Sequence, residues 1–301
     1  MARPRGSLVY QLTKELEGMK AFGSSKYADK LVNHGKPAKD RIYSYKTFHN
    51  YLSVGCAFIN YVRTEHPSVK TLDDARLYAA EYLNQRIGRG LSGWTVRLDA
   101  AALAKIFQCS CYELGVQLPP RNRSAITKNK THSWKGHFSP DKNKDQVEFC
   151  LGTGLRRSEI LKVTPEQVVQ KETGVWLMGI KGKGGRVRDV PVDPQYAARV
   201  REIAQDARDT GRDRIFERVS KNLPAHEYRA SYAQSYYNRI ARPAEELDRD
   251  RRFIMRNGHE RSEVYEARLE RAGTHYDARA MEEVSYALGH SRLDVVTAYI
   301  R

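Results

Sequence analysis

The chain has 301 residues, 40% of them hydrophobic, so it can build a core in each of two ordinary domains and is not wholly disordered. Its 52 Lys and Arg against 36 Asp and Glu give a formal net charge of +16, which points to a polyanionic partner. The absence of an apolar run of about 18 residues, of a secretory leader and of paired cysteines excludes a membrane span, secretion, a zinc site and a disulfide framework.

Four segments of the first hundred-odd residues carry apolar side chains at helical spacing. Leu8, Leu12, Leu16 and Met19 form one such stripe. The pattern predicts helices over Leu8–Phe22, Ser44–Tyr61, Leu72–Leu83 and Ser92–Leu114. We therefore expect a small all-α domain over residues 1–118, ended by a Leu-Pro-Pro sequence.

Residues 119–144 are polar and basic, and they have two interpretations. They form either a solvated linker or a strap that lies along phosphates. The net charge favours the strap. The expected DNA-backbone contacts are Arg121, Arg123, Lys128, Lys130 and Lys135.

Residues 145–301 are expected to form a second domain. A helix ends near Gly152, another covers Leu155–Val163, and Gly174–Ile180 with Arg186–Val192 reads as a hairpin around a glycine-rich turn. From Pro194 the pattern is helical to the end of the chain. The predicted fold class is mainly α with a small antiparallel hairpin or sheet.

Three local patterns in this domain combine basic, imidazole and phenol groups. Arg156 and Glu159 share a face at a helix start, where the carboxylate can hold the guanidinium for a phosphate. His226 and Arg229 have the same spacing. Leu288-Gly289-His290-Ser291 precedes a helix for which Ser291 and Asp294 have capping-box spacing, and a tyrosine follows nine residues after the histidine. Each pattern also has an ordinary structural explanation.

In this order, TGLRxxE, a glycine-rich Lys hairpin, HxxR, LGHS and a downstream Tyr resemble the tyrosine recombinase (phage integrase) family. The resemblance covers about Gln146 to the C-terminus, and the helical N-terminal domain suits that family's SAM-like core-binding domain. It implies that Glu159 is a supporting acid and that Lys181 is the alternative hairpin lysine to Lys183. The catalytic residues that it implies are Arg156, Lys183, His226, Arg229, His290 and Tyr299.

The resemblance further implies a site-specific enzyme of a mobile genetic element that cleaves and rejoins DNA through a 3′-phosphotyrosine and a Holliday junction. Its partners would be double-stranded recombination sites, three further subunits in a tetramer on DNA, and an accessory DNA-bending or directionality factor. No metal and no cofactor are expected, and the location would be cytoplasmic, on the bacterial nucleoid. The alternatives are a type IB topoisomerase-like enzyme and a catalytically silent DNA-binding protein on the same fold.

One departure from the common pattern is the long separation between Arg229 and His290. The excess, residues 242–280, is densely charged and resembles the longer loop of a subgroup of proteobacterial mobile-element integrases. It is either a solvated insertion or a contact to DNA or to a neighbouring subunit.

Overall fold

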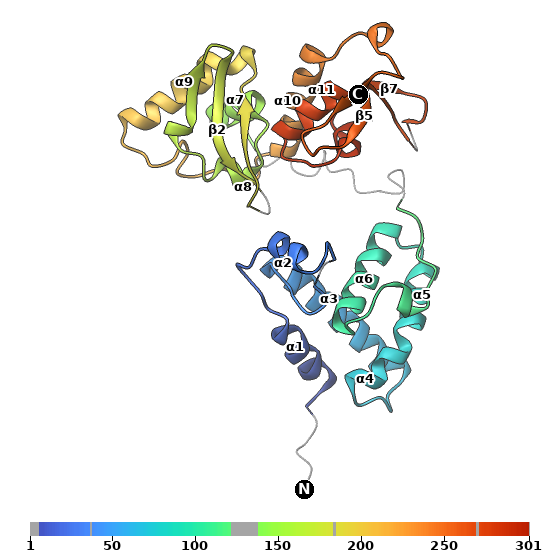
Figure 1. Cartoon of the computed structure of the whole chain (residues 1–301). Helices are drawn as coiled ribbons and strands as arrows, with labels where there is room; N and C mark the ends of the chain where they lie inside the picture. Colours follow the sequence, from blue (N-terminus) through green and yellow to red (C-terminus); the bar gives the residue numbers. More distant parts are fainter. Residues whose placement is uncertain (1–5, 37, 122–137, 183–184, 269–270, 301) are drawn as a thin grey trace. The chain divides into compact units, whose positions relative to one another are not determined.

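The computed structural model of the chain describes residues 6–36, 38–121, 138–182, 185–268 and 271–300. The chain divides into two units, Met1–Asn129 and Lys130–Arg301, and each has its own hydrophobic core (Figure 1). Within the described ranges, no helix combines the length and apolar character needed to cross a membrane.

The N-terminal unit is built from helices around a core that includes Leu12, Leu16 and Leu103. Ser and Thr side chains that accept a backbone N–H of the first turn begin five of these helices, so local polar residues define their starts. The elements are α1 (Leu8–Gly18), α2 (Lys26–Val32), α3 (Tyr45–Glu65), α4 (Leu72–Ala75), η1 (Arg76–Tyr78), α5 (Ala79–Gly88), α6 (Gly93–Ile106) and η2 (Tyr112–Leu114).

Several predicted helix bounds in this unit are wrong. The first helix stops at Gly18, because Lys20 pairs with Ile42 in an isolated β-bridge. The helix expected over 72–83 is interrupted by the 3₁₀ turn η1, and that over 92–114 ends at Ile106, before Gln108 adopts a left-handed φ of 49°. Helix α2 was not predicted because its apolar residues, such as Val32, are exposed and form no inward stripe.

The C-terminal unit packs its helices around a core that contains Phe149, Leu155, Tyr232 and Leu288. The helix predicted over 155–163 is shorter than expected, because α8 covers only Arg157–Ile160. The helical elements are η4 (Asp141–Asn143), α7 (Lys144–Thr153), α8 (Arg157–Ile160), η5 (Pro165–Gln167), α9 (Pro194–Asp209), α10 (Ala225–Ile240), η7 (Ala244–Glu246), α11 (Ala278–Ala287) and η9 (Leu293–Ala298).

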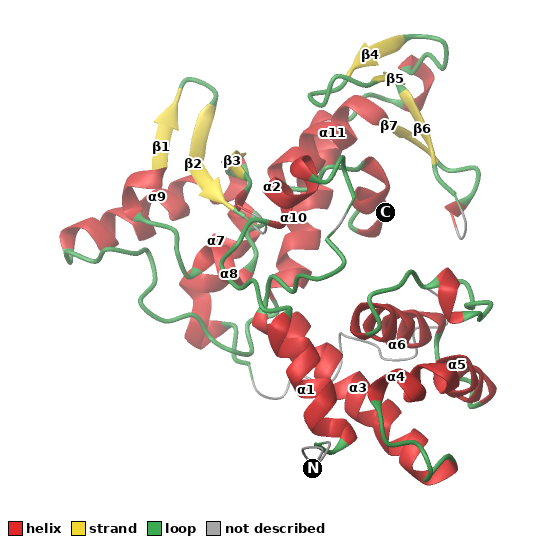
Figure 2. Ribbon diagram, turned by 60° about the horizontal axis from the view of Figure 1, so that its bottom comes forward, coloured by secondary structure: helices red, strands yellow, loops and turns green. Residues whose placement is uncertain are grey.

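The predicted hairpin is two strands of a three-stranded antiparallel sheet in the order β1-β2-β3. Its strands are β1 (Val168–Lys171), β2 (Gly174–Lys181) and β3 (Val187–Pro191). The register pairs Leu177 with both Val168 and Val190, and it shifts between Leu177 and Ile180. Helix α9 packs on this sheet (Figure 2). Strand β1 was not predicted because only four residues form it.

Residues 252–277 contradict the expectation of helix from Pro194 to the end of the chain. They form two small hairpins, of β4 (Arg252–Ile254) with β5 (Glu260–Ser262) and of β6 (Val264–Glu266) with β7 (His275–Asp277). Phe253 and Tyr265 are buried, and each stands between two more exposed residues, which is strand and not helix periodicity. The predicted fold class, mainly α with small antiparallel sheets, is confirmed.

Candidate active site

The turn between α7 and α8 holds Arg156 beside Glu159. Gly154 ends α7 with φ of 59°, and a Cβ there would lie 2.3 Å from the Tyr232 ring, so the turn requires glycine. Arg156 follows at the N-cap of α8. The Glu159 carboxylate accepts the Arg156 backbone N–H at 2.8 Å and its Nη1 at 2.9 Å, as the spacing predicted.

A second arginine, Arg188 of β3, holds the other side of the same carboxylate. Its Nη1 and Nη2 donate to Glu159 at 3.2 and 2.9 Å, and its Nε donates to the Ala287 carbonyl at 2.7 Å. Arg188 is 2% exposed. Sequence reasoning missed it, although its strand position has the same parity as Val190, so a charge at an inward-facing position was visible.

Glu159 is therefore a buried anion between two guanidinium groups. Burial raises the pKa of its carboxyl, but hydrogen bonds from Arg188 and from the Arg156 backbone, with the charges of both arginines, leave the pKa below its usual value. The carboxylate stays ionised at neutral pH and fixes the direction of the Arg156 fork.

Arg229, on α10, is the most enclosed cation of the group, with an exposure of 1%. Its Nη1 donates to the Gly154 carbonyl at 2.6 Å and its Nη2 donates to the Leu288 carbonyl. Its Nε finds no hydrogen-bond partner among the described residues. Burial, and next the charge of Arg156, lower the pKa of Arg229 to about 10, so it remains a cation at neutral pH.

His290 lies directly against these arginines. Gly289 has φ of 65°, and a Cβ there would lie 3.1 Å from the Arg188 guanidinium carbon, so only glycine lets the turn pass so close. Burial, and then the charges of Arg229 and Arg156, lower the pKa of His290 to about 4. The ring is neutral at neutral pH, and with Nε2 3.3 Å from Arg229 Nη2 it acts as an acceptor.

Tyr299 stands at the end of the 3₁₀ helix η9, with its ring centroid 5.8 Å from that of His290. The Arg229 guanidinium carbon is 5.9 Å from the same ring centroid. The capping box predicted at Ser291 is wrong, because Arg292 occupies the N-cap without a side-chain cap bond. The nine-residue spacing between His290 and Tyr299 nevertheless places the phenol next to the imidazole.

A cavity of about 1080 Å³ opens beside Arg156 and Tyr299 of this cluster. Arg156, His226 and Tyr299 line it, together with the N-terminal part of α10. His226 is exposed on that helix, three positions before the buried Arg229. The structure thus brings four of the six residues implied by the resemblance into one cluster and His226 to the same cavity.

The remaining residues named from the sequence are not among the described residues of this cluster. Lys183 is outside the described residues, and Lys181 is exposed at the end of β2. Arg121 is exposed on the N-terminal unit, 5.1 Å from the Trp94 ring centroid. Arg123, Lys128, Lys130 and Lys135 fall outside the described residues.

The cluster has the properties of an anion site with a phenol beside it. Two fixed guanidinium groups supply positive charge without a change of conformation, and the neutral imidazole adds a hydrogen-bonding group beside them. The phenol of Tyr299 borders the same space. Such a site suits attack on a phosphodiester, an anion whose charge must be neutralised before a nucleophile approaches.

Comparisons with known proteins identify the family and the fold. A family model described as the phage integrase family matches residues 137–301. The XerH site-specific recombinase bound to palindromic difH substrate, a post-cleavage complex, is 16% identical with a TM-score of 0.54, and 97% of this chain and 90% of that chain are covered. The XerH pre-cleavage complex gives 16% identity and a TM-score of 0.52 over 98% and 91%. The likeness to XerH shows the fold.

Another similar structure is the Tn1549 transposon integrase in complex with transposon right end DNA. It is 13% identical with a TM-score of 0.45, over 91% of this chain and 93% of that chain. The chain matches no curated protein sequence.

Proposed function

The chain belongs to the phage integrase family and is a tyrosine recombinase, and on this premise we propose that it performs site-specific recombination with Tyr299 as its nucleophile. We further propose that Arg156, Arg229 and His290 bind the scissile phosphate, with Glu159 as the supporting acid. The observation that carries the proposal is the cluster of Arg229, His290 and Tyr299, together with the cavity beside it that Arg156 and Tyr299 line.

The proposed chemistry needs no nucleotide cofactor. Arg156 and Arg229 hold the two non-bridging oxygens and stabilise the charge that develops as the phosphorane forms. The Tyr299 oxygen forms a bond to phosphorus and loses its proton to His226, while the bond to the 5′-oxygen breaks and Lys183 supplies that oxygen with a proton. The product is a 3′-phosphotyrosine, and attack by a free 5′-hydroxyl reverses the step or joins a new strand.

The proposed organisation is a clamp on duplex DNA. Residues 1–118 would bind the core of the site, the basic strap 119–144 would follow its phosphates, and residues 145–301 would carry the chemistry. XerH and the Tn1549 integrase have been solved with DNA, which supports DNA as the partner. Four subunits on two paired sites, exchanging strands through a Holliday junction, would complete recombination, and a mobile genetic element is the proposed context.

The test is covalent capture of DNA. A pool of nicked duplexes with random central sequence is incubated with the full chain, the covalent complexes are isolated under denaturing conditions, and one captured sequence is resynthesised as the trapping duplex. The nick lets the short cleaved strand diffuse away, so the 3′-phosphotyrosine accumulates. A chain that captures no sequence would contradict the proposal and favour the silent DNA-binding protein.

We expect the trapping reaction to proceed unchanged in EDTA. Guanidinium groups stand where a metal nuclease would use an ion to stabilise phosphorane charge, so chelation removes nothing that the proposed step uses. The measurement is the rate of adduct formation with EDTA and with added Mg²⁺. A strict need for Mg²⁺ would contradict the proposed mechanism.

Changing Lys128 and Lys130 together to Ala is expected to weaken binding to all DNA sequences alike and to flatten its salt dependence. Each lost phosphate contact lowers the slope of log K against log salt by about 0.9, because one condensed counterion fewer is released. Phosphates carry no base identity, so specificity should not change. Binding isotherms at several salt concentrations measure the slope, and an unchanged slope would mean that the segment is only a solvated linker.

A further inference from the structure

An ion network with buried carboxylates holds the insertion, residues 242–280, together and ties it to the first turn of α11. Arg242 donates to Asp277 at 2.8 Å and to Glu263 at 3.0 Å, and Arg279 donates to Glu263 at 2.8 Å. Both carboxylates are buried. A charged insertion with its acids paired in the interior is a folded part of the domain, and its position relative to α11 is defined.

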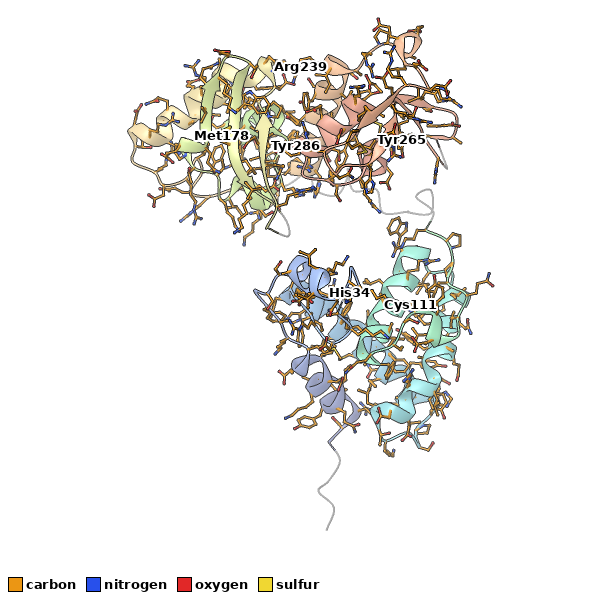
Figure 3. The ribbon with its side chains drawn as sticks, in the orientation of Figure 1. His34, Cys111, Met178, Arg239, Tyr265 and Tyr286 are labelled. Carbon is orange, nitrogen blue, oxygen red and sulfur yellow. The ribbon has the colours of Figure 1, made fainter. Side chains whose placement is uncertain are left out.

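A second set of contacts joins the insertion to α11. Arg256 donates to Glu283 at 2.7 Å, and its guanidinium carbon lies 4.1 Å from the Tyr286 ring centroid. Figures 1 and 2 both show β7 beside α11, and Figure 3 labels Tyr286 of that helix. The insertion is therefore held next to the helix that leads into His290.

From this anchored position, Arg271 of the β6–β7 loop contacts the segment that carries the proposed nucleophile. Its Nη1 donates to the Thr297 carbonyl at 2.6 Å and to the Ile300 carbonyl at 2.5 Å. The Tyr276 hydroxyl lies 3.3 Å from the same nitrogen. The two carbonyls come from residues on either side of Tyr299, so one guanidinium group is hydrogen-bonded to the backbone before and after it.

The segment itself has little local support. Helix η9 is a six-residue 3₁₀ helix, and at its end the Tyr299 and Ile300 N–H groups both donate to the Val296 carbonyl, at 2.8 and 3.2 Å. The carbonyls of Thr297 and Ile300 are among the groups that a helix end leaves without an intrahelical partner. A guanidinium there satisfies both and is favoured by the negative end of the helix.

We propose that Arg271 is a positioning residue for Tyr299, through which the insertion sets the direction of the phenol within its own subunit. The inference rests on the proposed role of Tyr299 as the nucleophile. In this scheme Arg271 acts on the backbone around Tyr299 and not on a reacting atom, since the hydrogen bonds of its Nη1 go to the two carbonyls and to the Tyr276 hydroxyl. Its effect is confined to the geometry of attack.

The first experiment compares adduct formation by the wild-type full chain and by Arg271→Ala, Arg271→Lys and Arg268→Ala on the trapping duplex. Arg268 is an exposed arginine of the same loop, so its variant matches the change in charge and side-chain size. We expect Arg271→Ala to lower the rate about 100-fold, as misplacement of a reacting group by about 1 Å does. The rate of Arg271→Lys should lie between those of the wild-type chain and Arg271→Ala, because an ammonium can donate to both carbonyls but lacks the planar guanidinium geometry. Arg268→Ala should behave as wild type.

The second experiment separates positioning from structural damage. Hydrogen peroxide, a small nucleophile, replaces the phenol in Tyr299→Phe, and its cleavage of the trapping duplex is compared with that by Tyr299→Phe/Arg271→Ala. Equal peroxide-dependent rates and equal DNA affinity are expected, because the cation site does not depend on Arg271. If Arg271→Ala does not fold, the same comparison is made with Arg271→Lys.

The outcomes distinguish a failure of the proposed function from a failure of the positioning role of Arg271. If the wild-type chain forms no adduct at Tyr299, the proposed function fails. If wild type forms that adduct and Arg271→Ala forms it equally fast, only the positioning role fails. A parallel loss of phenol-dependent and peroxide-dependent cleavage would also overturn the positioning role, since it would show that the arginine supports the whole site.

Discussion

Replacing Tyr299 by Phe is expected to abolish covalent attachment to DNA while leaving DNA affinity close to that of the wild-type chain. Only a hydroxyl is lost, and the ring keeps its place beside His290 and Arg229. Removal of a nucleophile from an intact site costs about 10⁴-fold or more in rate. The measurement is adduct formation on the trapping duplex under denaturing conditions, with affinity determined in parallel.

The matched control is Tyr286→Phe, which removes a hydroxyl from the same domain. Tyr286 is a partly buried tyrosine of α11 whose ring faces Arg256, and that contact does not use the hydroxyl. It should form adduct at the wild-type rate. Adduct formation by Tyr299→Phe, or its loss in Tyr286→Phe, would show that the nucleophile has been assigned to the wrong residue.

The second large effect is expected for Glu159→Gln, which should destabilise the C-terminal unit and slow adduct formation. The carboxylate accepts from Arg188 and from both the backbone and the side chain of Arg156. Removing one partner of a buried ion pair leaves the other charge unpaired, at a cost of about 3–5 kcal/mol. An amide would also turn its own N–H groups toward guanidinium donors. Chemical denaturation of the full chain, with hydrogen exchange over α8 and α11, measures the loss.

A double replacement distinguishes stability from catalysis at this position. Glu159→Leu together with Arg188→Met removes both buried charges, and such replacements are often neutral or stabilising. We expect the double variant to recover the stability lost in Glu159→Gln but not the rate of adduct formation, because Arg156 then has no carboxylate to fix its direction. Recovery of both would mean that Glu159 serves the fold alone.

The buried ion pair of Glu159 with Arg188 also predicts that the free energy of unfolding depends on pH. The pKa of Glu159 is lowered in the folded state, so the unfolded state binds its proton first as pH falls. Its contribution is complete above the ordinary value of about 4.5 and is lost as pH falls through the lower folded-state value. Over that range the stability difference between the wild-type chain and Glu159→Gln should shrink. A constant difference would contradict the assignment.

The amino-acid sequence by itself indicated Glu159 and the four clustered groups of the site, but not Arg188, and it indicated the starts of the helices capped by Ser44, Thr71 and Ser92. Arg156 and Glu159 meet because three positions on a helix start are neighbours in space, and the left-handed φ of Gly289 is a backbone conformation that favours glycine whatever surrounds it. Caps such as Ser44 act within three residues. Such interactions join residues that are close in the sequence. The order of the polar motifs and the mainly helical fold class could therefore be predicted from it.

Only the tertiary structure decided which distant groups complete these pairs. Arg188 is 29 positions from Glu159, and strand β3 must lie against α8 before the two can meet. The neutral state of His290 arises from burial next to arginines of other elements, not from its neighbours in the chain. The composition of the insertion left open a solvated loop or a contact to DNA or to a neighbouring subunit, and it gave no sign that Glu263 and Asp277 are buried and paired with Arg242. Desolvation and charge pairing depend on which groups the fold places around a side chain, and these groups cannot be identified from sequence spacing.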